Sequence, residues 1–351
     1  MLSDSPFAAP SGGLGSAAIH DSLGITSVAS PVAALGQKRF LFVTGKGGVG
    51  KTTVCASLAL AMAKQGKRVL VAMCNTKERL SAMLGTAPIE EEILEVHPNV
   101  WAVNISPDAA IAEHGANVLK VKALSAVFDS KVMRTFFRAV PGLYEWAMLG
   151  KAWFHTTETR ADGSFTYDVV LLDAPATGHG LDMLRVPKVI LDIVPPGILR
   201  RDAELAWELF SDPTRSGVIA VTLAEELPVT ETIELTTAIT SELGLPLQQL
   251  FVNAVVDPLF SIQERDGLAA LEDLLDPRAP RSAASPADVA VVAGARRALR
   301  ERVQEESVRR LLASVKLPTA ILPHLYDEAS TPQGTRRLAA HLGAATIDGR
   351  G

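Results

Sequence analysis

The sequence of 351 residues contains only two cysteines, Cys55 and Cys74. Two thiols cannot supply a network of disulfides or a four-thiolate metal site. Aromatic residues are also scarce, at 5% of the chain, although hydrophobic residues make up 48%. This high hydrophobic fraction excludes a wholly disordered chain, which would need low hydrophobicity and high net charge. The length predicts one large or two small folded domains.

A surplus of basic residues is lacking as well, because 34 Lys and Arg stand against 39 Asp and Glu. General nucleic-acid binders usually carry such a surplus, so no nucleic-acid partner is expected. No stretch approaches the roughly 18 apolar residues of a membrane-spanning helix. The most apolar stretch, 186–199, is interrupted by Lys188, Asp192 and Pro195-Pro196. We expect no transmembrane segment and, since the N-terminus lacks the basic start of a signal peptide, a cytoplasmic protein.

From Arg39 onward, short apolar runs alternate with longer helical patterns, which is typical of α/β folds. Seven strands are predicted, over residues 39–44, 68–73, 100–105, 168–173, 217–223, 249–255 and 317–322. Most are apolar throughout, as strands covered on both faces are. The pattern predicts a doubly wound, mostly parallel sheet in a single domain over about 38–345. Residues 1–37, rich in Gly, Ser, Ala and Pro, are predicted to form a flexible tail.

Two stretches are too long for simple connections between strands and have helical periodicity. We predict helical insertions over about 107–160 and 181–212, which together form a helical insertion subdomain. A charged segment at 295–315 has apolar residues at helical spacing and is predicted to be a solvated amphipathic helix.

A glycine-rich loop between a predicted strand and a predicted helix fits the pattern G-x-x-x-x-G-K-[ST]. Glycines allow the backbone N–H groups of such a loop to turn toward phosphate oxygens, and the helix that follows directs its positive end to the same anion. Lys51 is expected to contact the β- and γ-phosphates, and the Thr52 hydroxyl to bind Mg²⁺. The predicted binding residues are Gly45, Lys46, Gly47, Gly48, Val49, Gly50, Lys51, Thr52 and Thr53. The loop therefore predicts a nucleoside triphosphate site.

An aspartate, Asp173, closes the apolar strand at 168–173. An acid at this place beside a phosphate loop typically holds Mg²⁺ through its water shell. Thr52 and Asp173 are therefore the predicted metal-binding residues.

Two motifs resemble those of a known family. The form KGGVGKTT at 46–53 resembles the deviant Walker A loop, whose extra lysine, here Lys46, marks a branch of P-loop ATPases that includes nitrogenase iron protein, ParA, MinD and the arsenical pump-driving ATPases. The sequence DAPATGHG at 173–180 resembles the second switch of the ArsA family, which includes the ATPases that deliver tail-anchored membrane proteins.

The resemblance covers about residues 38–345 and implies a P-loop NTPase fold and a dimeric ATPase that binds ATP with Mg²⁺. It implies that Lys46 reaches across the dimer to the partner's nucleotide. Pro175 and Gly178 would lie in the switch that senses the γ-phosphate. Asn253 matches the strand-end asparagine that contacts adenine in the family, and Pro323 and His324 match the loop that packs on the base.

The first switch departs from the family, because Asn75 stands where the family has an aspartate that positions or activates water. An amide can hold a water but cannot accept its proton, and loss of a general base typically lowers the rate by about 10²- to 10⁴-fold. Glu78, three residues later, is expected to point elsewhere. With Lys46, Lys51, Asn75 and Asp173 as the predicted catalytic residues, we expect slow hydrolysis or a hetero-dimer with a catalytically complete relative.

Half of the 18 aromatic residues lie between 128 and 167, on the first predicted insertion. They form either the core of that insertion or an apolar surface for a client. We expect an ArsA-like ATPase, as a homodimer or hetero-dimer, whose nucleotide state controls binding of a protein partner or hydrophobic client. Two alternatives stay open: a non-catalytic nucleotide-binding regulatory subunit of a hetero-dimer, and a ParA- or MinD-like positioning ATPase.

Overall fold

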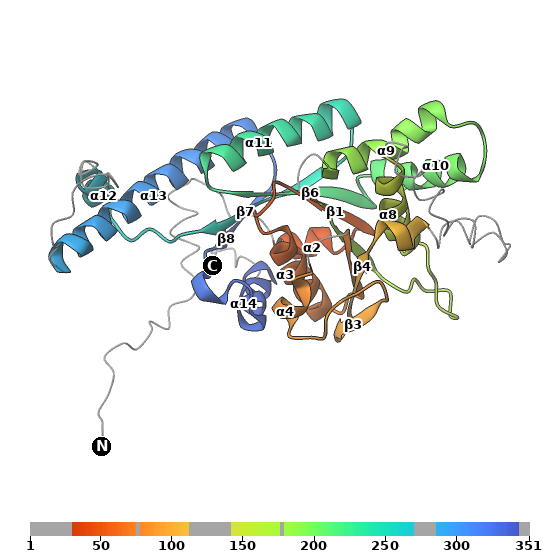
Figure 1. The fold of residues 1–351 in the computed structure, drawn as a ribbon, viewed down its shortest axis with the longest axis horizontal. Coiled ribbons are helices and arrows are strands. Elements are labelled where there is room, and N and C mark those ends of the chain that lie inside the picture. The colour runs from red at the N-terminus through yellow and green to blue at the C-terminus, as the bar shows by residue number, and fades with distance from the viewer. Residues whose placement is uncertain (1–29, 75–77, 112–141, 176–178, 270–285, 344–351) are drawn as a thin grey trace, which may run out of the picture.

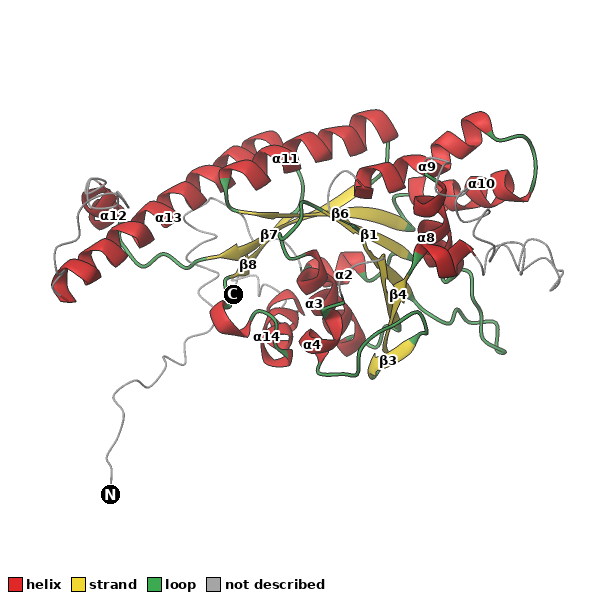
Figure 2. Cartoon of the chain, viewed as in Figure 1, coloured by secondary structure: helices red, strands yellow, loops and turns green. Residues whose placement is uncertain are grey.

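The computed structural model describes residues 30–74, 78–111, 142–175, 179–269 and 286–343. At its centre lies an eight-stranded sheet in the order β3-β4-β2-β5-β1-β6-β7-β8 (Figure 1). The strands are β1 (Phe40–Thr44), β2 (Val69–Cys74), β3 (Leu94–His97), β4 (Val100–Ile105), β5 (Val169–Asp173), β6 (Ser216–Leu223), β7 (Leu247–Val255) and β8 (Thr319–Pro323). Helices cover both faces of the sheet (Figure 2). The predicted α/β, mostly parallel, doubly wound architecture is confirmed.

All seven predicted strands are present, with ends within two residues of the predicted ones. Among themselves, these seven pair in parallel. The eighth, β3, was not predicted. It is a four-residue edge strand that pairs with β4 in antiparallel fashion, and only its Val96 is buried. Such a short, mostly polar run gives little hydrophobic signal, which explains the omission.

Successive residues of the central strands feed two cores on opposite faces of the sheet. In β1, Leu41 and Val43 belong to one buried cluster, whereas Phe40 and Phe42 belong to the other. This alternation follows from the two-residue period of a strand, and burial on both faces explains why β1 is apolar throughout.

The helices divide into two layers (Figures 1 and 2). One layer consists of α2 (Pro31–Leu35), α3 (Lys51–Lys64), α4 (Leu80–Leu84) and α14 (Pro332–Gly343). The other consists of α8 (Leu143–Phe154), α9 (His179–Ile193), α10 (Ile198–Ser211), α11 (Glu226–Thr237) with its π-helical continuation (Ala238–Leu243), and α13 (Pro286–Ser314). The short α12 (Ile262–Ala269) packs on the part of α13 that projects beyond the sheet. A 3₁₀ turn, Tyr326–Glu328, lies between β8 and α14.

The predicted tail and insertions can be compared with the structure in part. Residues 30–37, assigned to the tail, contain α2, and its Val32 and Leu35 are buried in the core. These residues therefore belong to the folded domain. Helix α8 lies in the first predicted insertion, while α9 and α10 form the second. Among the described helices, none is both long and apolar enough to cross a membrane.

The aromatic residues of the first insertion divide between core and surface where the structure describes them. Trp146 and Tyr167 are buried in the cluster that α8 shares with the sheet. Phe154 and Phe165 each expose 45% of their surface. Phe128, Phe136 and Phe137 lie outside the described residues. Trp146 and Tyr167 are therefore core residues, as one of the two interpretations of the aromatic cluster predicted.

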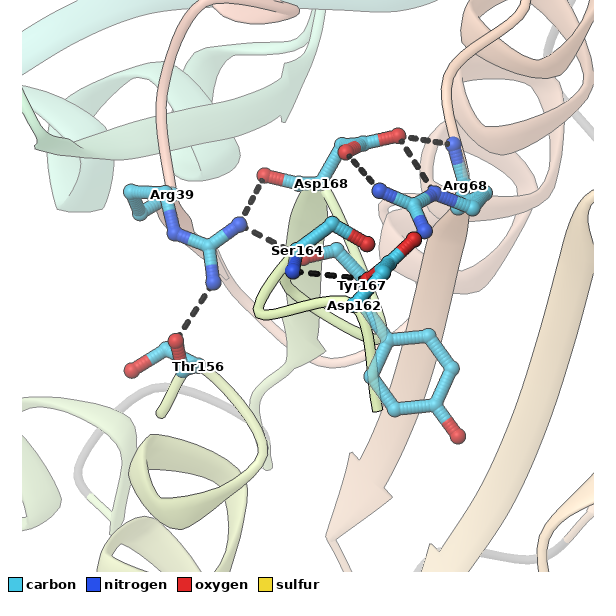
Figure 3. Close-up of polar contacts among 7 residues, drawn as sticks. All are labelled: Arg39, Arg68, Thr156, Asp162, Ser164, Tyr167 and Asp168. Carbon is cyan, nitrogen blue, oxygen red and sulfur yellow. Dashed lines mark hydrogen bonds and ion pairs between the residues drawn. The ribbon is translucent and has the colours of Figure 1, made fainter. Parts of the chain in front are cut away.

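At the amino ends of the strands, Arg39 ties the segment 155–168 to the start of β1 (Figure 3). Its guanidinium donates hydrogen bonds to the carbonyl oxygens of Thr156, Tyr167 and Asp168, the last at 2.7 Å. The same group stacks on the Phe165 ring, 3.7 Å from its centroid. One side chain thus satisfies three backbone carbonyls of a connection that has little regular structure.

Arg68, which precedes β2, makes a second attachment to this segment (Figure 3). Its guanidinium lies 2.7 Å from Asp168 Oδ1, and its backbone N–H donates to Asp168 Oδ2 at 2.8 Å. Burial alone would raise the pKa of Asp168, but the hydrogen bonds from Arg68 lower it below the ordinary value of 3.8. The charged form of the Asp168 carboxylate therefore stabilises the folded state.

Candidate functional site

The glycine-rich loop leaves the carboxyl end of β1 at the point where the strand order reverses. β5 lies on one side of β1 and β6 on the other. In open α/β sheets, ligands bind in the crevice at such a point, because connections diverge to opposite faces of the sheet there. The loop also leads directly into the first turn of α3.

Two glycines in this loop have conformations and surroundings that exclude a side chain. Gly45 has φ 151°, and a Cβ there would lie 2.2 Å from the Val221 carbonyl oxygen. Gly50 has φ 93°, and a Cβ there would lie 2.1 Å from Asn253 Nδ2. Both positions that the motif fixes as glycine therefore have φ values that favour glycine, and at Gly45 a side chain would also clash with the backbone.

Lys51 curls back over the loop that precedes it. Its Nζ donates to the carbonyl oxygens of Gly45 and Lys46, both at 3.1 Å. Burial lowers the pKa of Lys51, while the nearby Asp173 acts to raise it. The ammonium group therefore lies within the loop where a bound phosphate would meet it.

Thr52 and Asp173 come together at the base of the crevice, with Thr52 Oγ1 donating to Asp173 Oδ2 at 2.5 Å. Asp173 is only 1% exposed. Burial raises its pKa to about 6, while the hydrogen bond from Thr52 and the charge of Lys51 act to lower it. A hydroxyl and a carboxylate are the hard oxygen ligands that Mg²⁺ prefers, so these two residues fit a magnesium ion.

Lys46 does not point into the crevice but forms an ion pair with Glu231 of α11. Both side chains are about one third exposed, at 34% and 30%. The signature lysine is thus held by its own chain in this structure.

Asn253 braces the glycine-rich loop, since its Nδ2 donates to the Val49 carbonyl oxygen at 2.9 Å. The contact joins the end of β7 to the loop after β1. The next residue, Ala254, has φ 56°, a left-handed conformation that is uncommon outside glycine. The predicted contact of Asn253 with adenine stays a prediction, while its role in supporting the loop is an addition from the structure.

His324 follows β8, which ends at Pro323. The His324 Nδ1 accepts a hydrogen bond from the Tyr326 amide at 3.0 Å, so the neutral ring carries its hydrogen on Nε2. Burial, followed by the charges of Arg300 and Arg297, lowers the pKa of His324. His324 is therefore neutral at pH 7 and can donate one hydrogen bond.

A cavity of about 870 Å³ extends from the glycine-rich loop past the ends of β6, β7 and β8 to α13. The predicted residues that line it are Gly47, Gly48, Gly50, Lys51, Thr52, Thr53, Asp173, Asn253 and His324. The lining residues that were not predicted include Arg79, Met83, Arg296, Leu299, Arg300 and Val303. The last four recur at spacings of three and four, which places them on one helix face. The sequence predicted a solvated helix here, because a charged amphipathic pattern does not show what packs beside it.

Some predicted residues cannot be compared with the structure. Asn75 and Gly178 lie outside the described residues, and Pro175 is half-buried next to the strand that Asp173 closes. Glu78 accepts hydrogen bonds from the Ser81 amide at 2.7 Å and the Ser81 hydroxyl at 2.6 Å. It therefore caps the start of α4, which agrees with the expectation that it points away from the reaction.

These features define a class. The P-loop nucleotide-binding proteins have the same three features: a loop shaped by glycines between a parallel strand and a helix, a lysine folded over that loop, and a Thr–Asp pair beneath it. Comparison with known proteins adds a family resemblance. Residues 38–195 match the model of the anion-transporting ATPase family, ArsA.

Individual relatives are distant. The chain is 28% identical to ATPase BagA of Mycobacterium tuberculosis over 229 residues, 61% of this chain and 64% of that protein. It is 26% identical to an arsenical pump-driving ATPase of Escherichia coli over 62% of this chain and 39% of that protein. It is 31% identical to ATPase get3 of Schizosaccharomyces japonicus over 43% of this chain and 45% of that protein. The chain thus spans just under two thirds of the mycobacterial relative and less than half of the others.

Proposed function

We propose that the chain binds ATP with Mg²⁺ and hydrolyses it as a dimer, with its nucleotide state controlling the binding of a protein partner or an apolar client. The observation that carries the proposal is the contact between Thr52 and Asp173 beneath the glycine-rich loop. These two groups lie on different elements, α3 and β5, and have no evident structural reason to share a buried crevice with a lysine.

Each residue has a task in this proposal. The loop amides and the amino end of α3 would bind phosphate oxygens, and Lys51 would exchange its carbonyl contacts for the β- and γ-phosphates. Thr52 and Asp173 would hold Mg²⁺, which when bound neutralises charge on those phosphates. Asp173 is mostly ionised at pH 7, because its pKa of about 6 lies below that value.

The departure at Asn75 supports slow hydrolysis by the isolated chain. Glu78 caps α4 through Ser81 and is not available as a replacement base. This observation also favours a second candidate function, a non-catalytic nucleotide-binding subunit that pairs with a complete relative. The two candidates share the nucleotide site and differ in whether this chain alone turns ATP over.

The elements after Asp173 offer a route from nucleotide to partner. Helix α9 begins six residues after Asp173 and packs against α8 and α10. Several apolar side chains on α9 and α10 face solvent: Val189, Ile193, Ile198 and Leu205. Ile193 is the most exposed of them, at 73%. An exposed apolar group next to a nucleotide switch suits a partner or client surface.

Calorimetric titration with ATP, with and without Mg²⁺, tests the nucleotide site. We expect Mg²⁺-dependent binding that Lys51→Ala abolishes. Lys64→Ala, at the exposed far end of the same helix, is the matched control and should bind as the wild type does. An unchanged affinity in Lys51→Ala would refute the proposal.

A single-turnover assay separates the two candidates. Slow but measurable release of phosphate by the wild type, lost in Asp173→Asn, supports the ATPase. Binding without any turnover, alone and with a related subunit added, supports the regulatory subunit. Sedimentation of the ATP-bound protein with DNA or liposomes would instead support the positioning ATPase.

A further inference from the structure

One wall of the cavity comes from α13, at the end of the cavity that is far from the glycine-rich loop. Arg296, Leu299, Arg300 and Val303 line the cavity from this helix. Their spacing of three and four residues puts them side by side on consecutive turns. This wall contains two cations and two apolar side chains, together with the amide of Gln304, which also lines the cavity, a composition unlike that of the glycine-rich end.

The position of α13 assigns it to the base end of a bound nucleotide. β8 is the third strand from β1, in the order β1-β6-β7-β8. At about 4.8 Å per strand, the end of β8 lies about 14 Å from the loop. His324, which follows β8, also lines the cavity, and the charge of Arg300 acts on its ring. A triphosphate held at Lys51 cannot reach that far, whereas the base of an extended nucleotide can.

The wall is held firmly in place. Gln304 accepts a hydrogen bond from the Val256 amide at 2.8 Å and donates one to the Val256 carbonyl at 3.0 Å. Glu301 accepts from the Leu259 amide at 2.9 Å and pairs with Arg297 at 2.6 Å. These contacts fix α13 to the chain that leaves β7. A stacking surface that is fixed before binding loses less entropy when the ligand arrives.

Among the described residues, no carboxylate pairs with either arginine of the wall. Within the described residues, neither Arg296 nor Arg300 forms an ion pair, whereas Arg297 on the adjacent face does. A guanidinium is planar, is weakly hydrated and stacks well on aromatic faces. It is a donor only, so it cannot accept the amino hydrogens of adenine, whereas its flat face can stack on any purine.

We propose that Arg300, flanked by Leu299 and Val303, stacks on the purine base of the nucleoside triphosphate bound at the glycine-rich loop. The proposal rests on the proposed nucleotide site and deepens it. It assigns base binding to α13, in addition to the residues that follow β7 and β8. Arg296, one turn earlier, extends the same wall.

Substitutions at Arg300 distinguish stacking from charge, with affinity for ATP and Mg²⁺ measured by calorimetric titration. Arg300→Ala should weaken binding about tenfold, the size of one lost base-stacking contact. Arg300→Tyr should restore affinity to within about threefold of wild type because it keeps a flat face, whereas Arg300→Lys should stay near the alanine value. Arg309→Ala and Arg309→Tyr, on the exposed side of the same helix, are the matched controls and should not change affinity.

Rescue by tyrosine but not by lysine supports the proposal. Every other pattern overturns it: rescue by lysine would mean a phosphate contact, and an unchanged Arg300→Ala would mean no contact. Failure of the proposed function gives a different result. In that case the wild type itself binds no ATP, or Lys51→Ala binds as well as the wild type.

Discussion

At the scale of single residues, Glu231 decides where Lys46 points. The ion pair keeps the signature lysine on its own chain, against α11. If Lys46 acts on the nucleotide of a second chain, this pair must break first. Because both side chains are about one third exposed, the pair contributes at most about 1 kcal/mol, which is small enough for dimer formation to overcome.

Glu231→Gln should therefore favour the ATP-dependent dimer. Loss of up to about 1 kcal/mol of competing interaction corresponds to a gain of up to about fivefold in dimer affinity. Analytical ultracentrifugation with a non-hydrolysable ATP analogue and Mg²⁺ measures this. Glu234→Gln, on the exposed face of the same helix, should have no effect. A weaker dimer in Glu231→Gln would show that Glu231 assists assembly instead of restraining Lys46.

The two cysteines allow a second prediction at the scale of single residues. Both are fully buried. Burial raises the pKa of both thiols, and the nearby Asp173 raises both further. Since the thiolate is the reactive form, neither should react with a disulfide reagent at pH 8 in the native protein. Both should react after unfolding in guanidinium. Rapid reaction of one native thiol would show that β2 or α3 opens locally.

At the scale of elements, the segment 155–168 depends on two arginines for its attachment to the sheet. Arg39→Ala would leave three backbone carbonyls without their donor and remove the stacking on Phe165. We expect a loss of about 2–3 kcal/mol in the free energy of unfolding, measured by urea denaturation. Arg160→Ala, an exposed arginine of the same segment, should cost less than about 0.5 kcal/mol. Equal losses in the two variants would contradict this assignment.

The Arg68–Asp168 pair makes a prediction about pH. Because the pKa of Asp168 is lower in the folded state, its contribution is fully present above its ordinary value of 3.8 and is lost as pH falls through the depressed value. Asp168→Asn should cost about 1 kcal/mol at pH 7, since the pair is partly exposed and screened. The difference from wild type should vanish at a pH below the depressed pKa. A difference that persists there would indicate packing instead of charge.

The sequence predicts best those elements whose signal is local. The seven apolar strands and α3 follow from runs of residues that are buried on both sides, and the glycine-rich loop follows from a short motif between a strand and a helix. The sequence did not predict the contacts between distant segments. The bonds from Asn253 to Val49 and from Lys46 to Glu231 join residues 204 and 185 positions apart. The cavity-lining face of α13 likewise depends on where the sheet places the ends of β7 and β8.

At the scale of the whole molecule, the proposed dimer gives a direct prediction. With Mg²⁺ and a non-hydrolysable ATP analogue, light scattering should give twice the 37.2 kDa mass of one chain. Lys46→Met should still bind ATP but lose at least about 100-fold in turnover, because a cation supplied across an interface contributes that much or more. Full activity in Lys46→Met would remove the trans role of this lysine.

A hetero-dimer gives a different result in the same experiment. The isolated chain would then keep the mass of one chain with the analogue, and addition of the related subunit would produce the doubled mass.

Helix α13 has one more consequence, which concerns its length. It runs for 29 residues, about 43 Å, and Arg300 lies about 20 Å from its first residue. The part before the cavity projects past the sheet and carries α12 (Figure 1). The part from Glu301 onward is held by contacts with the chain after β7 and with α11, so the projecting part extends from a fixed base. A tilt of about 5° of this helix would move the tip by about 2 Å and displace α12 with it. A small movement of α13 at the base of a nucleotide would thus become a larger movement at its projecting tip.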